Sequence, residues 1–69
     1  MGVLISPTAG KVRAVRIRVG QMVTETDEAF VIEGKSDLCA VHGNPGVVKE
    51  VLVNEGDVVN GNCLLAVIE

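Results

Sequence analysis

The segment whose residue types best fit a chemical role is Glu33-Gly-Lys-Ser-Asp37, at the middle of this 69-residue chain. Its lysine, Lys35, carries a primary amine, which can attack an activated carboxylic acid and form an amide bond. Gly34 and the polar residue after it separate two apolar segments, a pattern that predicts a two-residue hairpin with a type II′ turn. Gly34 would then take φ > 0, and Lys35 would be the second central residue with its ammonium group in solvent. The alternative is that Lys35 is an ordinary turn lysine that keeps the hairpin tip soluble.

Metal binding and nucleophilic catalysis are less well supported. Of the residues Cys39, His42 and Cys63, only Cys39-x-x-His42 has a spacing used at zinc sites, and no second pair completes a tetrahedral set. Cys39 is expected in an apolar strand, where a thiol behaves as a small hydrophobic group. We therefore expect no metal site and no catalytic residue. Two cysteines are also too few for a disulfide scaffold, and a reducing intracellular setting accounts for them.

Composition indicates one small all-β domain that spans residues 1–69. The chain is 48% apolar with a mean hydropathy of +0.42, and its 14 valines and 4 isoleucines are typical of pleated, half-buried strands. No window of a dozen residues shows helical periodicity. No apolar run reaches the length of a membrane span, and the first residues do not resemble a secretory signal. We therefore expect a cytoplasmic protein without a membrane partner.

The charge distribution argues against nucleic acid as a partner. The first 24 residues carry +4, and the remainder carries −7, which together give the net charge of −3. Nucleic-acid surfaces combine basic residues with aromatic side chains that stack on bases, whereas Phe30 is the one aromatic residue here. We expect the first basic segment to be a solvated surface, because Arg16 and Arg18 alternate with apolar residues.

An internal repeat organises the sequence. Residues 10–33 align without a gap on residues 46–69 at an offset of 36, and eight of the 24 positions are identical. The identical pairs are Gly10/Gly46, Val12/Val48, Val15/Val51, Gly20/Gly56, Val23/Val59, Val31/Val67, Ile32/Ile68 and Glu33/Glu69. The halves span about 1–33 and 37–69, joined by a hairpin at 33–37. Neither half has enough apolar residues to form a core, so the two halves must pack on each other.

Each half is expected to contain a strand, a turn and another strand. Glycines open the first strand and close it with a tight turn or φ > 0, and an apolar strand follows a short connection. In the first half, the first strand includes Val15–Val19, between Gly10 and Gly20, and the later strand is Ala29–Ile32. In the second half, the first strand includes Val51–Val53, between Gly46 and Gly56, and the later strand is Leu64–Ile68. Two four-stranded antiparallel sheets related by a pseudo-twofold axis follow from this pattern.

The whole chain resembles the biotinyl/lipoyl attachment domain family, closest to biotin carboxyl carrier domains. Ser6–Gly10 matches the family's opening motif (A/S)P-x-x-G, and both Val19–Val23 and Glu55–Val59 match its repeated motif xG(D/Q)xV. Leu64–Glu69 matches its closing strand. Lys35 lies 11 residues before Gly46, which is the family's spacing from the lysine to the next glycine. The resemblance implies a flattened β-barrel or sandwich of two four-stranded sheets, called a barrel-sandwich hybrid. It also implies that Lys35 is the attachment site, flanked by Glu33, Gly34 and Ser36.

The modification motif departs from that of the family. Biotin acceptors carry Glu-Ala-Met-Lys-Met and lipoyl acceptors carry Glu-x-Asp-Lys-Ala, with the glutamate three residues before the lysine. Here Gly34 and Ser36 flank the lysine, and Glu33 lies two residues before Lys35. Glu25-Thr-Asp-Glu-Ala29 resembles the lipoyl motif with glutamate in place of lysine, but the repeat places this segment in a different loop.

Three classes of function remain. The first is a non-catalytic carrier with biotin on Lys35, which moves carboxyl groups between partner active sites of a biotin-dependent carboxylase after a biotin ligase has modified it. A lipoyl carrier modified by a lipoate ligase is the alternative within this class. The second is an unmodified domain of the same fold that serves as a binding or assembly module. The third, an enzyme, is the least supported, because no acid, base or nucleophile constellation is present.

Overall fold

A computed structural model describes residues 2–69 as an all-β protein without helices. Its strands are β1 (Gly2–Ile5), β2 (Gly10–Val15), β3 (Met22–Val23), β4 (Glu28–Glu33), β5 (Leu38–His42), β6 (Gly46–Val51), β7 (Val58–Val59) and β8 (Leu64–Ile68). Met1, which belongs to the expected first half 1–33, lies outside the described residues. The described part of the chain holds no helix that is long and apolar enough to cross a membrane.

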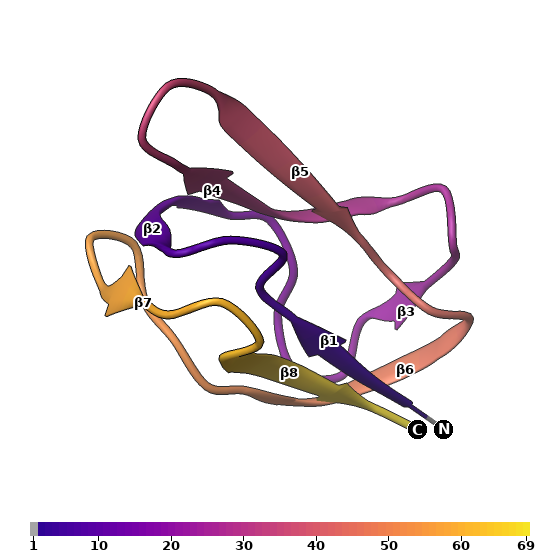
Figure 1. Ribbon diagram of the computed structural model, residues 1–69. Coiled ribbons are helices and arrows are strands. Elements are labelled where there is room, and N and C mark those ends of the chain that lie inside the picture. The colour runs from indigo at the N-terminus through magenta and orange to yellow at the C-terminus, as the bar shows by residue number, and fades with distance from the viewer. Residues whose placement is uncertain (1) are drawn as a thin grey trace.

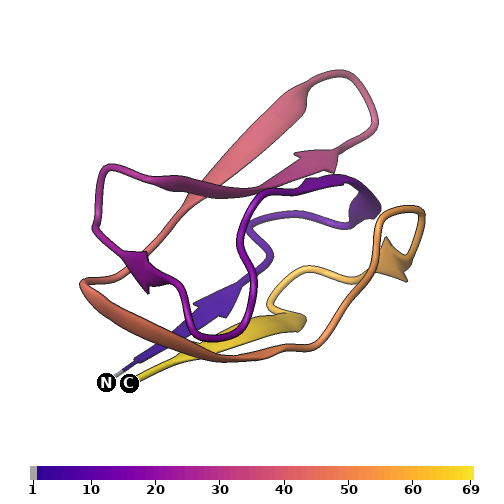
Figure 2. The same cartoon turned by 180° about the vertical axis from the view of Figure 1, so that it is seen from behind.

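The strands form two antiparallel four-stranded sheets, as the sequence predicts. One sheet has the order β1-β8-β6-β3, and the other has the order β5-β4-β2-β7. The two sheets enclose the core between them, and the termini lie next to each other at one end (Figures 1 and 2). The β4–β5 hairpin projects at the other end of the molecule (Figure 1).

The two halves of the repeat exchange their outer strands. Strands β1 to β4 come from the first half and correspond in order to β5 to β8 of the second. Each sheet takes its two inner strands from one half and its two outer strands from the other, so the pseudo-twofold operation converts one sheet into the other. Each four-stranded sheet therefore needs both halves, because one half supplies the inner pair and the other supplies the two edges.

Part of the core is made of residues that the repeat duplicates. The equivalent pairs Val12/Val48, Val23/Val59 and Ile32/Ile68 are all at most 4% exposed. Phe30 and Leu65, which the repeat does not match exactly, are fully buried and fill the centre between them. Identity at these three pairs therefore reflects interior packing, in which even a single methylene group changes stability.

The first strand of each half ends earlier than the sequence predicts, so most of the expected segments Val15–Val19 and Val51–Val53 is not strand. Strands β2 and β6 end at Val15 and Val51, and each makes one more backbone hydrogen bond before the chain leaves its sheet. The reason is topological, because β2 and β3 lie in different sheets and the segment between them must cross from one to the other. Arg16 and Arg18 are exposed as expected, but they lie on this crossing segment rather than on a strand.

Both crossings end in the expected glycine turns. Gly20 and Gly56 have φ of 90° and 95°, in the region that favours glycine. Their amides donate hydrogen bonds of 2.8 Å to the carbonyls of Val48 and Val12, in the opposite half of the repeat. The turn glycines thus fix each crossing segment to the other half of the molecule.

Candidate functional site

The hairpin between β4 and β5 carries the candidate attachment residue. Glu33 and Leu38 form the last strand pair, and the amide of Gly34 donates a hydrogen bond of 2.8 Å to the carbonyl of Asp37. This bond closes the loop, so the two residues at the tip are Lys35 and Ser36. Both side chains are exposed to solvent.

The turn differs from the type II′ turn that the sequence predicts. Gly34 is not among the residues with positive φ, and Lys35 is the first residue of the tip rather than the second. The closing hydrogen bond lies one residue further along the chain than the Gly-polar pattern indicates. Gly34 therefore extends the paired part of the hairpin, and its position does not require glycine for conformational reasons.

The amino group of Lys35 is presented without an ionic partner. Three ion pairs occur among residues 2–69, and Lys35 takes part in none of them. Its neighbours at the tip, Ser36 and Asp37, are also exposed, so no wall of the protein covers the amine. An enzyme could approach this side chain from outside without displacing any contact that holds the fold.

Glu33 has a structural contact that sequence reasoning missed. Its Oε1 lies 3.0 Å from Nη1 of Arg13 on β2, so the carboxylate is paired with the neighbouring strand rather than with Lys35. The repeat duplicates this ion pair, because Lys49 Nζ lies 2.8 Å from Oε2 of Glu69. The hydrogen bond and the charge of Glu69 raise the pKa of Lys49. The equivalence of Arg13 with Lys49 and of Glu33 with Glu69 was the sequence signal that could have revealed the pair.

A loop from the first half lies against the base of the hairpin. A β-carbon built on Gly34 would lie 3.5 Å from Cγ2 of Thr8 and 3.4 Å from the carbonyl oxygen of Asp37, which are ordinary contacts. Thr8 is held in turn by the buried hydroxyl of Ser6, which donates a hydrogen bond of 2.6 Å to the Thr8 carbonyl. An open hollow of about 330 Å³ beside the hairpin is lined by Arg13 and residues 33–38.

The sequence position of Ser36 bears on the family motif. Ser36 lies three residues after Glu33, which is the interval that the family motifs give to their lysine. Lys35 lies one residue earlier, yet it shares the exposed tip with Ser36. The structure thus leaves Lys35 at the tip but one residue out of register with Glu33.

The other candidate residues lie elsewhere and apart from one another. Cys39 and His42 are on β5, Cys63 precedes β8, and both cysteines are half-buried free thiols. Within residues 2–69, no three side chains of His, Cys, Asp or Glu come together as a metal site would require. The lipoyl-like segment 25–29 lies in the β3–β4 connection and the start of β4, away from the hairpin tip.

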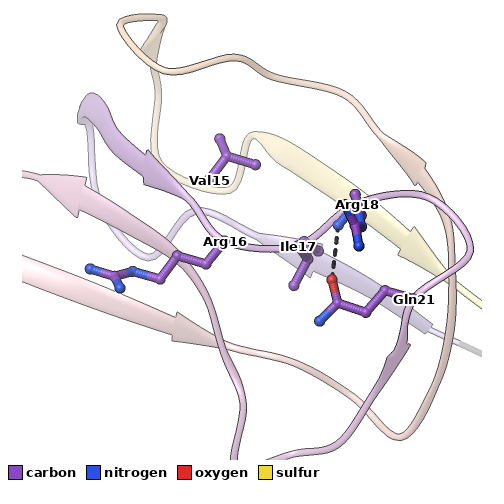
Figure 3. A pocket seen from close by; sticks show the side chains of 5 residues that line it. All are labelled: Val15, Arg16, Ile17, Arg18 and Gln21. Carbon is purple, nitrogen blue, oxygen red and sulfur yellow. Dashed lines mark hydrogen bonds between the residues drawn. The ribbon is translucent and has the colours of Figure 1, made fainter.

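A second hollow of about 450 Å³ lies on the crossing segment between β2 and β3. Figure 3 shows that Arg16 and Arg18 extend from it in different directions, while the amide of Arg18 donates to Oε1 of Gln21 at 3.2 Å. The same turn recurs in the second half, where the amide of Asn54 donates to Oδ2 of Asp57 at 2.8 Å. The turn at this hollow is therefore a repeated feature of the fold, and the two arginine side chains do not converge.

Comparison with known proteins gives one family and a set of similar structures. The model of the family described as "Biotin-requiring enzyme" matches residues 2–68. No match was found among curated protein sequences. The solved structures below cover 99% of this chain.

A segment of the urea carboxylase of Kluyveromyces lactis superposes with a TM-score of 0.88 at 29% sequence identity. The chain spans only 6% of the length of that carboxylase. The lipoyl domain of the 2-oxoglutarate dehydrogenase complex from Azotobacter vinelandii superposes with a TM-score of 0.80 at 24% identity, and the chain covers 96% of it. At this identity the second likeness shows the fold alone.

Proposed function

The chain belongs to the family of biotin and lipoyl attachment domains, and on that premise we propose that it is a carrier domain with biotin joined to Lys35 by an amide bond. Domains of this family are in general non-catalytic carriers. The observation that supports the proposal most strongly is the position of Lys35, an exposed amine at the tip of the loop between the two repeat halves.

The residues around Lys35 fit a covalently attached group. The side chain is exposed and unpaired among the described residues, so amide formation at Nζ disrupts no contact of the fold. Arg13 and Glu33 join the base of the hairpin to β2, and β4 is an inner strand of its sheet. Biotin, when bound, would supply the carboxyl-carrying chemistry, while the chain supplies a rigid base and a projecting arm.

Biotin is preferred over lipoate on the evidence of the similar proteins. The urea carboxylase segment is similar in both sequence and fold, whereas the lipoyl domain supports the fold alone. We infer a biotin ligase as the modifying partner and a carboxylase or transferase as the enzyme served, with the cytoplasm as the location. The lipoyl carrier, with a lipoate ligase and a dehydrogenase complex as partners, remains the alternative.

An unmodified binding or assembly module is the second candidate, and the sequence of the tip favours it. Ser36 lies at the interval from Glu33 that the family gives to lysine, and Gly34 provides no side chain at the tip. A ligase that reads this interval would find a hydroxyl group instead of an amine. The fold would then be retained for its surfaces rather than for its lysine.

The intact mass of the protein isolated from its native cell separates these candidates. A mass increase equal to biotin minus one water supports the proposed function, and an increase equal to lipoic acid minus one water supports the lipoyl alternative. The unmodified mass, in a cell whose other acceptor domains are modified, would contradict both carrier functions. Peptide mapping then assigns the modified lysine.

Rebuilding the family motif at the tip should raise biotin labelling strongly. The change replaces Gly34 with Ala-Met and includes Ser36→Met, so that the lysine lies three residues after Glu33 with methionine on both sides. Methionine offers adaptable apolar contact to a ligase, and one extra loop residue costs little entropy. Because Gly34 has no positive φ, its loss should not strain the hairpin. The measurement is the initial rate of labelling by a purified biotin ligase with biotin and ATP.

The matched control replaces Gly34 with Ala-Ala and keeps Ser36, which restores the interval without the methionines. If spacing alone limits recognition, the control will be labelled as fast as the rebuilt chain. Equal labelling of the natural and rebuilt chains would contradict the idea that the tip is a weakened acceptor. Failure of the rebuilt chain while it remains folded would argue that this barrel is not a ligase substrate.

A further inference from the structure

The outer face of the β1-β8-β6-β3 sheet is more apolar than the outer face of the β5-β4-β2-β7 sheet. Nine large hydrophobic side chains are exposed among residues 2–69, and six of them belong to this sheet or the residue just beyond it. Their exposed fractions range from 39% to 77%. We call this surface the apolar face and define it by Val3, Ile5, Met22, Val47, Leu52 and Leu64.

Strand pairing brings these side chains together. Ile5 pairs with Leu64 across β1 and β8, and Met22 pairs with Val47 across β3 and β6. The buried neighbours Leu4, Val23 and Val48 alternate with them and point into the core, so the exposed residues share the opposite side of the sheet. The six residues thus share one side of the sheet, where the exposed Lys49 and Glu50 lie between Val47 and Leu52 on β6.

The internal repeat supplies a control for this surface within the same molecule. The residues equivalent to Leu52 and Leu64 are Arg16 and Glu28, which form an ion pair of 3.3 Å on the other sheet. Glu28 pairs with His42 on β5, as Leu64 pairs with Ile5 on β1. His42 therefore has the position on one sheet that Ile5 has on the other. The residue equivalent to Val47 is Lys11.

These equivalent positions have the same backbone and are exposed on both sheets, so the fold does not require leucine or isoleucine there. A row of charged or polar side chains satisfies one sheet, and a row of apolar side chains lies in the same place on the other. Exposed apolar side chains that gather on one face indicate an interaction site, whereas single scattered ones do not. The difference between the two faces therefore reflects contact with something other than water.

We propose that the apolar face is the interface at which two copies of this chain associate about a twofold axis. A self-complementary contact needs an apolar surface without an excess of one charge. The charges on and beside this face nearly cancel, because Lys49 pairs with Glu69 and leaves Glu50 as the remaining charged residue of β6. The face has no row of like charges that a partner of opposite charge could recognise.

A stable dimer would have to bury the whole face. A standard stable interface takes roughly 800 Å² from each partner. The six apolar side chains would be buried together with Lys49 and Glu50, which lie between Val47 and Leu52 on the inner strand β6, and with Glu69, which pairs with Lys49.

The test is sedimentation equilibrium of the unmodified protein over a concentration series, with the double variant Leu52→Arg/Leu64→Glu. This variant copies the ion pair of Arg16 and Glu28 onto the apolar face and leaves the net charge unchanged. We expect a dimer for the natural chain and a monomer for the variant over the same concentrations. Thermal unfolding measures whether the variant is folded. We expect that it is, because the fold accommodates Arg16 and Glu28 at the equivalent positions of the other sheet.

A second pair of variants keeps the test decisive if the double variant does not fold. Met22 and Val58 are equivalent in the repeat and are exposed to 77% and 82%, but only Met22 lies on the apolar face. Met22→Lys should weaken dimerisation at least about tenfold, and Val58→Lys should leave it unchanged. A natural chain that stays monomeric, a folded double variant that still dimerises, or equal effects of the two lysine substitutions would each overturn the proposal.

Discussion

Lys35→Ala is expected to abolish covalent modification completely and to leave the fold intact. The chain contains three lysines, and Lys35 is the one at the hairpin tip. Its side chain makes no ion pair among the described residues, so its removal costs the fold little, within about 0.5 kcal/mol for an exposed turn position. Loss of the acceptor amine should nevertheless reduce labelling to zero, because no other group at the tip can form the amide.

Intact mass spectrometry after reaction with ligase, biotin and ATP measures this effect. Lys49→Ala is the matched control, because Lys49 is also exposed but lies on β6 in an ion pair with Glu69. The control should be labelled like the natural chain. Labelling of the Lys35→Ala protein at Lys11 or Lys49 would contradict the assignment of the site, even if the chain is a genuine carrier.

Gly10→Ala is expected to destabilise the whole domain. A β-carbon on Gly10 would overlap the carbonyl oxygen of Glu33, at the base of the hairpin. Neither strand can move away easily, because Lys11 next to Gly10 pairs with Glu33, and Glu33 pairs with Leu38 on its other side. Forced overlap of this kind costs about 1 to 3 kcal/mol, a large share of the stability of a 69-residue chain.

Thermal unfolding monitored by circular dichroism measures the loss, which should lower the midpoint by about 4 to 8 °C for each kcal/mol. Gly34→Ala is the control, since its added β-carbon would meet no atom closer than 3.4 Å. Gly46→Ala should resemble Gly10→Ala, because a β-carbon there would lie 2.6 Å from the carbonyl oxygen of Glu69. Similar midpoints for Gly10→Ala and Gly34→Ala would refute the close approach of β2 to the hairpin base.

The repeat and the hairpin could be predicted from the sequence because both depend on local chemistry. Alternating apolar residues and the glycines at 20 and 56 indicate strands and turns wherever they occur in the chain. The offset of 36 then implies two equivalent halves, and the middle of the chain must connect them. The exposure of Lys35 follows from its place in that connection.

The register of the turn could not be predicted in the same way. A glycine before a polar residue indicates a turn at the tip, but the closing hydrogen bond forms between Gly34 and Asp37. Which residues close a hairpin depends on how β4 and β5 pair along their whole length, as far as Glu28 and His42. A slip of one residue would move every side chain of β5 to the opposite face of the sheet, so the core decides the register.

Local sequence patterns were enough to predict two four-stranded sheets, their internal symmetry and a lysine between the two halves. The folded structure adds that the halves exchange their outer strands and that Arg13 pairs with Glu33. It also shows that Ile5, Leu64 and Leu52 are exposed on one sheet at positions where the other sheet carries charged or polar residues. Periodicity shows which residues of a strand share a face, because that depends on neighbours in the chain. It does not show which strands become partners, because pairing is set by contacts between residues far apart in sequence, which form only when both sheets close over one core.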